Sequence, residues 1–464
     1  MNGRENDLTA IDDAVERALD WLSVVPTREV PSRLTPEEVI ASLGDLSERG
    51  RPAPEVIDSL DEAVRPGLMA SGSGRFFGWV MGATLPVAIG ADWLVTAWDQ
   101  NAGMRDSTPG VVGVEETAAR WLLDLLGLPE DSAVGFTTGA TMANFTGLAA
   151  ARGAVLSRLG WDVETQGLIG APPVRVLVGE ERHGSIDLAL RYLGLGRAET
   201  VRVDDQGRID VADLASRLAE PSETRGGTIV CLQAGNIHSG AFDDFAGAVE
   251  AAHRHGAWVH VDGAFGLWAA VVPDLADLTA GLAGADSWAT DAHKTLNTPY
   301  DCGISVVADA KAALAATSSH ASYLLTSSRV DPHELVPEMS RRARGVPVWA
   351  ALAYLGRDGV RNLVAGLVEA ARGIADGISA IPGTTVLNDV VYTQVSATFG
   401  DRTGEVFGRI IEDGTIMPSA SVWHGQPVIR FSVSSWRTGT EEVAQTVRAV
   451  RTAAEGADVL SPVS

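Results

Sequence analysis

Cysteine and lysine are both rare in this chain of 464 residues. The two cysteines, Cys231 and Cys302, lie far apart in the sequence and outside any CxxC pattern. A disulfide framework or a thiolate zinc site is therefore not expected. Lysine also occurs only twice, at Lys294 and Lys311, so a lysine in a conspicuous sequence context is informative.

Positive charge is scarce as well. Lysine and arginine together number 36 against 60 aspartate and glutamate residues, which gives a formal net charge of −24. Nucleic-acid phosphates and anionic lipid surfaces are bound by clustered basic side chains, and no such cluster stands out in the sequence. The composition argues against a nucleic-acid-binding protein and against one that docks on a membrane surface.

Long apolar runs are missing too. The longest apolar stretches, such as residues 263–273, have about half of the roughly 20 residues that a membrane-spanning helix needs. The first seven residues, MNGREND, lack the apolar core of a signal peptide. These absences predict a soluble cytoplasmic protein, and the length of the chain predicts about two or three packed units.

The pattern of the sequence changes twice along the chain. Up to about residue 95 it is helical, and Thr35-Pro36-Glu37-Glu38 forms a capping box with proline at the first helical position. From about residue 130, short β-branched runs alternate with amphipathic stretches, which is typical of a mostly parallel sheet covered by helices. The predicted strands are 133–138, 174–178, 200–203, 228–232, 258–261, 286–290 and 303–307.

The second change comes at about residue 341. Beyond it the pattern predicts helices over 348–355 and 360–379, strands near 391–396 and 428–433, and a last helix from about residue 440. We therefore predict an α/β protein in three parts. These are a helical N-terminal arm (1–95), a large α/β domain (96–340) and a small α+β domain (341–464).

Four groups of chemically capable residues fall where predicted strands end, the edge at which open α/β sheets place their ligands. In the group around Gly139, Ala140 and Thr141, a strand turns into a helix whose free amides and dipole favour an anion. The Walker and GxGxxG patterns are absent, and a tight strand-to-helix turn explains the segment equally well.

In the second group, Asp262 ends an apolar strand, where a buried acid needs a partner. A protonated ring nitrogen of a ligand would serve, and so would a helix cap.

The other two groups contain a lysine and a histidine. Asp291-Ala292-His293-Lys294 directly follows a predicted strand, and a desolvated lysine at such an edge becomes a carbonyl-reactive amine that forms a Schiff base. A solvated lysine is the general alternative, but here the residue is one of only two lysines. The last group contains His183, whose imidazole would either stack on a flat ligand or be a structural or solvated residue at a helix end.

Together the four groups describe a pocket for a flat, phosphorylated, aldehyde-bearing heterocycle, a description that pyridoxal 5′-phosphate (PLP) fits. With these residues in this order, the sequence resembles the group II PLP-dependent amino-acid decarboxylases of the aspartate-aminotransferase fold superfamily, from about Arg75 to Arg437. The most specific stretch is 291–303, DAHKTLNTPYDCG, which is similar to the family's segment around the cofactor-bearing lysine. The resemblance implies a fold type I PLP-dependent enzyme.

The resemblance also implies a role for each matching residue. Lys294 would carry the cofactor as a Schiff base, and Asp262, 32 residues earlier as in the family, would keep the pyridine nitrogen protonated. His183 and Ala264 would pack on the two faces of the ring. The remaining expected cofactor contacts are Ala140, Thr141 and His293 at the phosphate, with Asp291 close by, and Asn236 at the phenolic oxygen.

One segment is similar to the part of the family that lines the side-chain pocket near a dimer interface. It is Phe76-Phe77-Gly78-Trp79-Val80-Met81, in which Phe77, Trp79, Val80 and Met81 are the candidate substrate contacts. The segment has no lysine or arginine to anchor a side-chain carboxylate. The resemblance therefore implies a homodimer that decarboxylates an L-amino acid, with an aromatic or apolar side chain favoured, to the amine and CO2.

One loop departs from the family. Aromatic amino-acid decarboxylases usually have a mobile-loop tyrosine, before an Arg-Arg pair, that takes part in protonating the substrate carbanion. Residues 329–338 contain no tyrosine, and His333 is the candidate replacement, with a solvated loop histidine as the alternative. In relatives, a change of that tyrosine accompanies oxidative deamination to an aldehyde. The alternatives to a decarboxylase are thus an aldehyde synthase, another carbanion enzyme such as a transaminase, and a catalytically silent PLP-binding protein.

Overall fold

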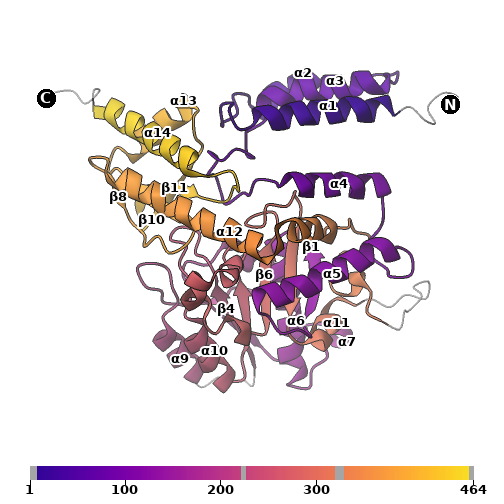
Figure 1. The fold of residues 1–464 in the computed structure, drawn as a ribbon. Coiled ribbons are helices and arrows are strands. Elements are labelled where there is room, and N and C mark those ends of the chain that lie inside the picture. The colour runs from indigo at the N-terminus through magenta and orange to yellow at the C-terminus, as the bar shows by residue number, and fades with distance from the viewer. Residues whose placement is uncertain (1–7, 221–225, 319–328, 459–464) are drawn as a thin grey trace.

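The computed structural model describes residues 8–220, 226–318 and 329–458. The first seven residues, considered above for a signal peptide, lie outside these ranges. The N-terminal part folds into helices α1 (Thr9–Val24), α2 (Pro36–Leu43) and α3 (Ala53–Val64), which lie together above α4 in Figure 1. Thr35 caps α2 with the predicted capping box, in which Thr35 Oγ1 accepts the Glu38 N–H and the Glu38 carboxylate accepts the Thr35 N–H.

A sheet of seven strands, counted over the described residues, forms the centre of the molecule. Its order is β1-β7-β6-β5-β4-β2-β3. Each predicted strand is present, with ends that differ from the prediction by at most two residues. The strands are β1 (Ala133–Thr137), β2 (Val174–Gly179), β3 (Glu199–Val201), β4 (Gly227–Gln233), β5 (Trp258–Asp262), β6 (Ser287–Asp291) and β7 (Gly303–Val307).

Strand direction in this sheet follows from the connections. Strands β6, β5, β4, β2 and β3 are mutually parallel, whereas β7 is antiparallel to both of its neighbours, β6 and β1. No helix separates β6 from β7, and a parallel pair requires a long crossover. The sequence therefore predicts the mostly parallel sheet correctly, and the short connection accounts for the one reversed strand.

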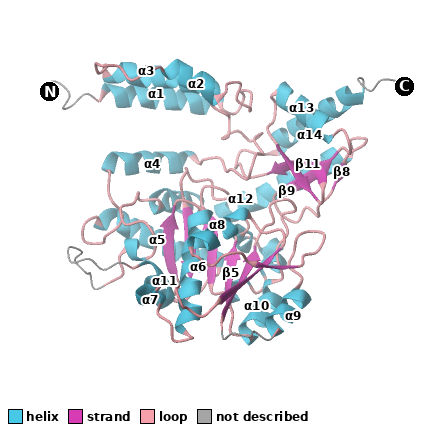
Figure 2. Cartoon of the chain, turned by 180° about the vertical axis from the view of Figure 1, so that it is seen from behind, coloured by secondary structure: helices cyan, strands magenta, loops and turns pink. Residues whose placement is uncertain are grey.

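Helices cover both faces of the sheet, as the burial along each strand requires. In β4, Ile229 and Cys231 pack against α6, α8 and α11, whereas Val230 and Leu232 belong to the core shared with α5, α10 and α12. Figure 2 shows α6, α8 and α11 in front of the sheet. This alternation with buried side chains on both faces is typical of a parallel sheet between helix layers. The bounds are α4 (Pro86–Trp98), α5 (Pro109–Leu126), α6 (Ala140–Ser157), α7 (Val163–Gln166), α8 (Gly184–Tyr192), α9 (Val211–Ala219), α10 (Phe245–Arg254) and α11 (Ala310–Thr317), with 3₁₀ turns η1 (Arg65–Gly67), η2 (Leu267–Val271), η3 (Pro273–Thr279), η4 (Leu282–Gly284) and η5 (Pro332–Glu334).

The C-terminal part builds a second, antiparallel sheet of order β10-β11-β9-β8. The two helices predicted over 348–355 and 360–379 are present as the two parts of α12, which meet at a kink at Gly356, where φ is 61° and ψ is −178°. Strand β10 was not predicted from the sequence. It is joined to β11 by the two-residue turn His424-Gly425, and both residues of this hairpin turn have positive φ. The elements are α12 (Gly345–Ser379), β8 (Thr385–Val386), β9 (Gln394–Thr398), α13 (Thr403–Asp413), β10 (Ser419–Trp423), β11 (Gln426–Ser432) and α14 (Thr440–Asp458).

In the part of the chain that the structure describes, no helix has both the length and the apolar character required to cross a bilayer.

A buried ion pair joins the segment just before α12 to helix α5. Arg341 Nη1 lies 2.6 Å from Glu115 Oε2, and the two side chains are only 1% and 3% exposed. Arg341 also donates to the carbonyls of Ala102 and Phe136, and the Gly345 N–H donates to Glu115. Because most of the charge is met by hydrogen bonds, the pair is tolerated in the core, but either partner left alone would be a buried, unpaired charge.

We therefore expect Arg341→Leu to lower the free energy of unfolding by about 3–5 kcal/mol. Arg361→Leu is the control, because Arg361 pairs with Asp358 on the surface, where the side chains are 44% and 88% exposed. Its loss should cost no more than about 1 kcal/mol. Urea denaturation of the two variants and the parent tests this, and equal midpoints for both variants would contradict the structural weight given to the buried pair.

Candidate active site

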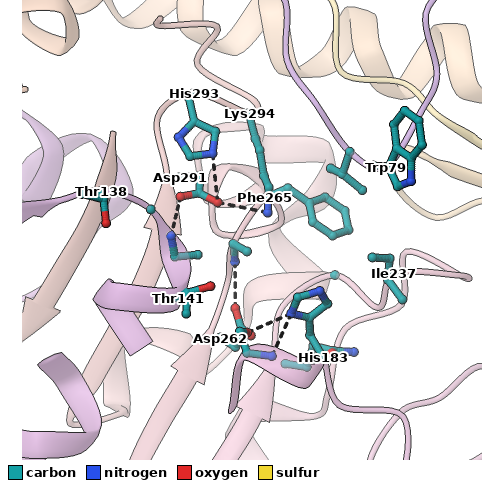
Figure 3. A pocket seen from close by; sticks show the side chains of 17 residues that line it. Trp79, Thr138, Thr141, His183, Ile237, Asp262, Phe265, Asp291, His293 and Lys294 are labelled. Carbon is teal, nitrogen blue, oxygen red and sulfur yellow. Dashed lines mark hydrogen bonds and ion pairs between the residues drawn. The ribbon is translucent and has the colours of Figure 1, made fainter. Parts of the chain in front are cut away.

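A cavity of about 410 Å3 opens where β1, β4, β5 and β6 end. Sites for small organic ligands have volumes of about 300–1,000 Å3. Figure 3 shows Lys294, Asp291 and His293 on one side of it and Asp262 and His183 on the other. The lining residues are Trp79, Val80, Thr138, Gly139, Ala140, Thr141, His183, Ser185, Gln233, Gly235, Ile237, Asp262, Ala264, Phe265, Asp291, His293 and Lys294.

The Asp291 carboxylate connects two of the groups that the sequence analysis singled out. It is the last residue of β6 and is 2% exposed. Its Oδ1 accepts the Ala140 N–H at 2.6 Å, at the first residue of α6, and its Oδ2 lies 3.0 Å from Lys294 Nζ. A carboxylate at a helix N-terminus is favoured by the helix dipole. The Ala140 amide, predicted to contact a phosphate, is thus engaged by Asp291 here.

His293 lies beside the same carboxylate, with its Nε2 3.5 Å from Asp291 Oδ2. Its Nδ1 accepts the Cys302 N–H at 3.1 Å, so the ring hydrogen is on Nε2, toward Asp291. Burial lowers the pKa of His293 below its ordinary value, and the neutral ring is favoured at neutral pH. The ring packs on Tyr300 at 4.2 Å between centroids.

Asp262 is the last residue of β5, and His183 lies between β2 and α8, with β4 between the two strands. Burial raises the pKa of Asp262, while the nearby His183 and Lys294 and hydrogen bonds from Ala264 and Asn144 oppose that rise. His183 Nδ1 accepts the N–H of Ser185 at 3.2 Å and caps α8. Both interpretations of His183 therefore apply, because it is a helix cap whose ring also lines the cavity.

The donor set of the cavity fits PLP. Asp262 offers a carboxylate for a protonated ring nitrogen, Lys294 offers an amine for an aldehyde, and the N-terminal turn of α6 offers a positive dipole end for a phosphate. His183 and Ala264, the two residues expected on the ring faces, both line the same space. The groups that PLP requires therefore meet in a cavity of suitable size.

Two residues hold the Lys294 turn rigidly, and sequence reasoning missed both. Asn297 adopts a φ of 58°, and its amide donates to the carbonyls of Lys294, Thr295 and Ser434 at 2.9–3.0 Å. Gly82 passes so close that a Cβ there would lie 2.2 Å from the Lys294 carbonyl oxygen. A signal for Asn297 existed, since asparagine is enriched among residues with positive φ.

The structure divides the predicted substrate segment. Trp79 and Val80 line the cavity, whereas Phe77 is fully buried in the C-terminal core, with its ring 5.9 Å from that of Phe431. Met81 packs in a small cluster around Phe76 instead. The cause is a bend at Trp79 and Val80, whose φ values of 53° and 73° turn the chain out of the regular alternation.

Two further predicted site residues, Asn236 and His333, lie outside the cavity lining of the described chain. Asn236 is fully buried outside the cavity lining, and its amide donates to Glu181 and accepts the N–H groups of His238 and Ser239. These hydrogen bonds fix the loop between Gly235 and Ile237, both of which line the cavity. His333 lies in η5, buried, with its backbone N–H bonded to the Gly103 carbonyl. It is not among the residues that line the cavity in the described chain.

Ile237 and Phe265 line the cavity although the sequence analysis did not select them. Each follows the end of a predicted strand by a few residues, and that position was the available signal. Motifs of reactive polar residues do not include such positions, although pockets for small ligands are lined mostly by apolar side chains.

This fold and this cavity define a fold type I PLP-dependent enzyme. The model of the pyridoxal-dependent decarboxylase conserved domain matches residues 36–399. An aromatic-L-amino-acid decarboxylase from Bacillus atrophaeus is 25% identical over 477 residues, which is 97% of this chain and 95% of the relative. An acidic amino acid decarboxylase from Mus musculus is 25% identical over 412 residues, 85% of this chain and 74% of the relative. The solved structure of Oryza sativa TDC with PLP and tryptamine has a TM-score of 0.90 at 20% identity and covers 98% of this chain and 99% of that one.

The chain belongs to the pyridoxal-dependent decarboxylase family, the group II PLP-dependent amino-acid decarboxylases that its sequence resembles. It is an enzyme, a carboxy-lyase with PLP as its cofactor. At about 25% identity to relatives of different substrate class, family membership alone leaves the substrate open.

The close packing at Gly82 makes a prediction. Gly82→Ala should displace the Lys294 turn, because the added methyl group would meet the Lys294 carbonyl oxygen at 2.2 Å. We expect a loss of about 1–3 kcal/mol of stability and faster loss of cofactor during desalting. Gly408→Ala in α13 is the matched control, since a Cβ there meets nothing within 4 Å. Thermal unfolding and retained absorbance measure both effects. Equal behaviour of the two variants would refute this account of the turn.

Proposed function

We propose that this enzyme decarboxylates an L-amino acid with an aromatic or apolar side chain and releases the amine and CO2. The observation that carries the proposal is the apolar wall of the cavity, made by Trp79, Val80, Ile237 and Phe265. In the described part of the chain, Lys294 is the one lysine or arginine that lines it. An acidic side chain would find no second cation there, and a buried carboxylate without a partner is costly. The near full-length match to an aromatic-L-amino-acid decarboxylase supports the same choice.

The residues that would hold the cofactor each have a proposed task. Lys294 would hold the cofactor through its amine, which is kept in place by the Asp291 carboxylate at 3.0 Å. Asp262 would hold a proton on the ring nitrogen, and His183 and Ala264 would confine the ring. Thr141, His293 and the first turn of α6 would receive the phosphate. When bound, PLP supplies an electron-withdrawing ring that stabilises the charge left behind as CO2 departs.

Product outcome depends on which group returns a proton to the substrate carbon. The N–H of His183 and the amine of Lys294 are the proton donors that we propose, because both line the cavity. His333 lies outside it. The absence of a tyrosine from residues 329–338 favours a second candidate function, in which decarboxylation is followed by oxidative deamination to an aldehyde.

A substrate screen tests the proposal. Purified enzyme with PLP is incubated with L-tryptophan, L-tyrosine, L-phenylalanine, L-leucine, L-glutamate and L-2,4-diaminobutyrate, and CO2, amine, aldehyde, ammonia and peroxide are measured. We expect CO2 and amine in equal amounts from an aromatic or apolar substrate. Activity confined to glutamate or diaminobutyrate would refute the substrate class, and aldehyde with peroxide under oxygen would identify the second function.

Lys294→Ala is the companion variant for that screen. It should lose the visible absorbance of the bound cofactor and at least about a thousandfold in activity, because no other lysine lines the described cavity. Lys311→Ala is the matched control, since Lys311 lies in α11, outside the cavity lining. A visible band that persists in Lys294→Ala would rule out Lys294 as the cofactor-bearing residue.

We also propose that the enzyme is a homodimer in which the N-terminal arm (1–95) covers a second copy. In Figures 1 and 2 the arm helices lie apart from the two sheets. They carry exposed large apolar side chains, and contiguous exposed apolar surface is typical of interfaces. Those side chains are Ile11 and Leu19 on α1, Ile40 and Leu43 on α2, Val56 and Leu60 on α3, and Trp93 and Leu94 on α4.

Light scattering after gel filtration should therefore give twice the 48.6 kDa mass of the chain. Replacing both Trp93 and Leu94 by Glu should produce monomers, because charges would enter an apolar contact. Ile169→Glu, at a position that is 96% exposed outside the arm, should leave the dimer intact. A parent enzyme that is monomeric and fully active would contradict the proposal.

A further inference from the structure

A row of buried polar side chains runs beneath the cavity, from β5 and β6 to α6. Trp258 Nε1 lies 2.9 Å from Ser287 Oγ, and that hydroxyl lies 2.8 Å from His260 Nδ1. His260 Nε2 lies 2.9 Å from Asn144 Oδ1. All four side chains are at most 1% exposed. At the end of the row the Asn144 amide nitrogen lies 3.3 Å from Ser185 Oγ, and the Asn144 side chain is also one of the neighbours that oppose the rise in the pKa of Asp262.

The chemistry of the groups sets one direction for these hydrogen bonds. The Trp258 indole can only donate, so Ser287 Oγ accepts from it and gives its own hydrogen to His260 Nδ1. Burial lowers the pKa of His260 to about 3, so the ring is neutral and its single hydrogen is on Nε2. That hydrogen goes to Asn144 Oδ1, which leaves the amide NH2 of Asn144 to face the Asp262 carboxylate and the Ser185 hydroxyl, 3.3 Å away.

We propose that Asn144 and His260 are positioning residues for Asp262, through a one-way hydrogen-bond relay Trp258–Ser287–His260–Asn144 that holds the Asp262 carboxylate ionised and aimed at the cofactor's ring nitrogen. The inference rests on the proposed function of Asp262 and adds to it the residues that make that function available.

The relay answers an electrostatic problem. Burial raises the pKa of Asp262, and a protonated acid could not serve as the counter-ion of a protonated ring nitrogen. The titratable groups around the carboxylate are His183 and Lys294, which oppose the rise, and Cys231, whose own pKa burial raises so that it stays a neutral thiol. A hydrogen bond from a fixed amide adds to this opposition without adding a charge.

The packing of α6 is adapted to the relay. A Cβ on Gly147 would lie 2.8 Å from His260 Cε1 and 2.9 Å from Nδ1. Glycine weakens a helix interior because of its conformational entropy, so its presence in the middle of α6 is explained by the space that the buried imidazole takes. With His260 fixed in this way, the orientation of the Asn144 amide follows.

The test compares matched variants of the apoenzyme and the PLP-loaded enzyme. Asn144→Asp keeps the shape of the side chain but turns a carboxylate oxygen toward Asp262. His260→Leu removes both ring nitrogens, while His260→Gln retains an N–H donor near the position of Nε2. Asp262→Asn is the reference, and Asn388→Leu is the control, because Asn388 is a buried asparagine bonded to Ser239 and Gln394, away from the cavity lining.

Three quantities are measured: the PLP dissociation constant from quenching of tryptophan fluorescence, the pH at which the absorbance of bound PLP changes, and the unfolding temperature of the apoenzyme. We expect Asn144→Asp and His260→Leu to weaken PLP binding by about 10- to 100-fold, the range for a lost hydrogen bond to a charged group, and His260→Gln to recover most of it. Asn388→Leu should lower the unfolding temperature and leave PLP binding unchanged.

The pH readout has a defined sign. A second carboxylate beside Asp262 raises its pKa, so in Asn144→Asp the acid takes up its proton at a higher pH as the pH falls. The acid limb of the absorbance profile should therefore move up by about one pH unit, equivalent to a tenfold change. A purely structural role for Asn144 would not move it.

The outcomes separate the relay from the function on which it rests. If Asp262→Asn weakens PLP binding while Asn144→Asp and His260→Leu bind as the parent does, the relay is wrong and the function of Asp262 stands. If Asp262→Asn also binds as the parent does, the assignment of Asp262 fails and the relay fails with it. Should His260→Leu not fold, the isosteric Asn144→Asp decides the matter alone.

Discussion

The Asp291 carboxylate is the contact on which the cavity depends. Its two oxygens connect the end of β6, the first amide of α6 and the amine of Lys294. Asp291 and Lys294 lie about 150 residues from Ala140 in the sequence, and the strand and the helix belong to separate elements of the fold. Without an acid at this position, the helix N-terminus and the lysine would lack the common partner that holds them together. The geometry of the site is thus set by one buried anion that has two cationic or dipolar partners.

The same region is braced from the C-terminal part of the chain. The side-chain NH2 of Asn297 donates hydrogen bonds to the carbonyls of Lys294 and Ser434, and its Oδ1 accepts the N–H of Trp436. A Cβ on Gly303 would lie 2.3 Å from the backbone of Gly139, so β7 and the start of α6 touch without an intervening side chain. Because backbone meets backbone at these places, small displacements cannot be absorbed by rotamer changes.

Much of the fold could be read from the sequence, and the reasons are visible in particular strands. Residues 229–232 are apolar on both faces, and residues 258–261 are as well except for His260, so their pattern indicates strands of a covered parallel sheet. The cavity residues that lie directly at strand ends, such as Asp262 and Lys294, were found by the same logic. Phe77 and Met81 were placed wrongly because the bend at Trp79 and Val80 needs positive φ at two residues that rarely adopt it.

Other parts of the site leave no local trace. Asn144 and His260 lie inside a helix and a strand, where a polar residue in one sequence signals burial with a partner but not which partner. His333 illustrates the converse, because a polar residue in a suggestive loop proves to be buried away from the cavity. Residue type indicates what a side chain can do, and only the packing of α6 against β5 and β6 brings the members of the relay together.

The chain has a negative net charge, and the phosphate of its cofactor is negative as well. The arrangement of charges in the site shows how the two are accommodated. A protein of net charge −24 must receive a phosphate in a cavity that already contains two carboxylates. Asp291 is compensated by Lys294 and by the start of α6, while Asp262 lies on the opposite side of the cavity, beside His183 (Figure 3). We infer that the two carboxylates give the cavity a polarity. The anionic end of the ligand is favoured only at the helix terminus, and its protonated ring only at Asp262. The orientation of the cofactor then follows from the dipoles and buried charges inside the cavity. The net charge of the distant surface matters less, because salt screens it.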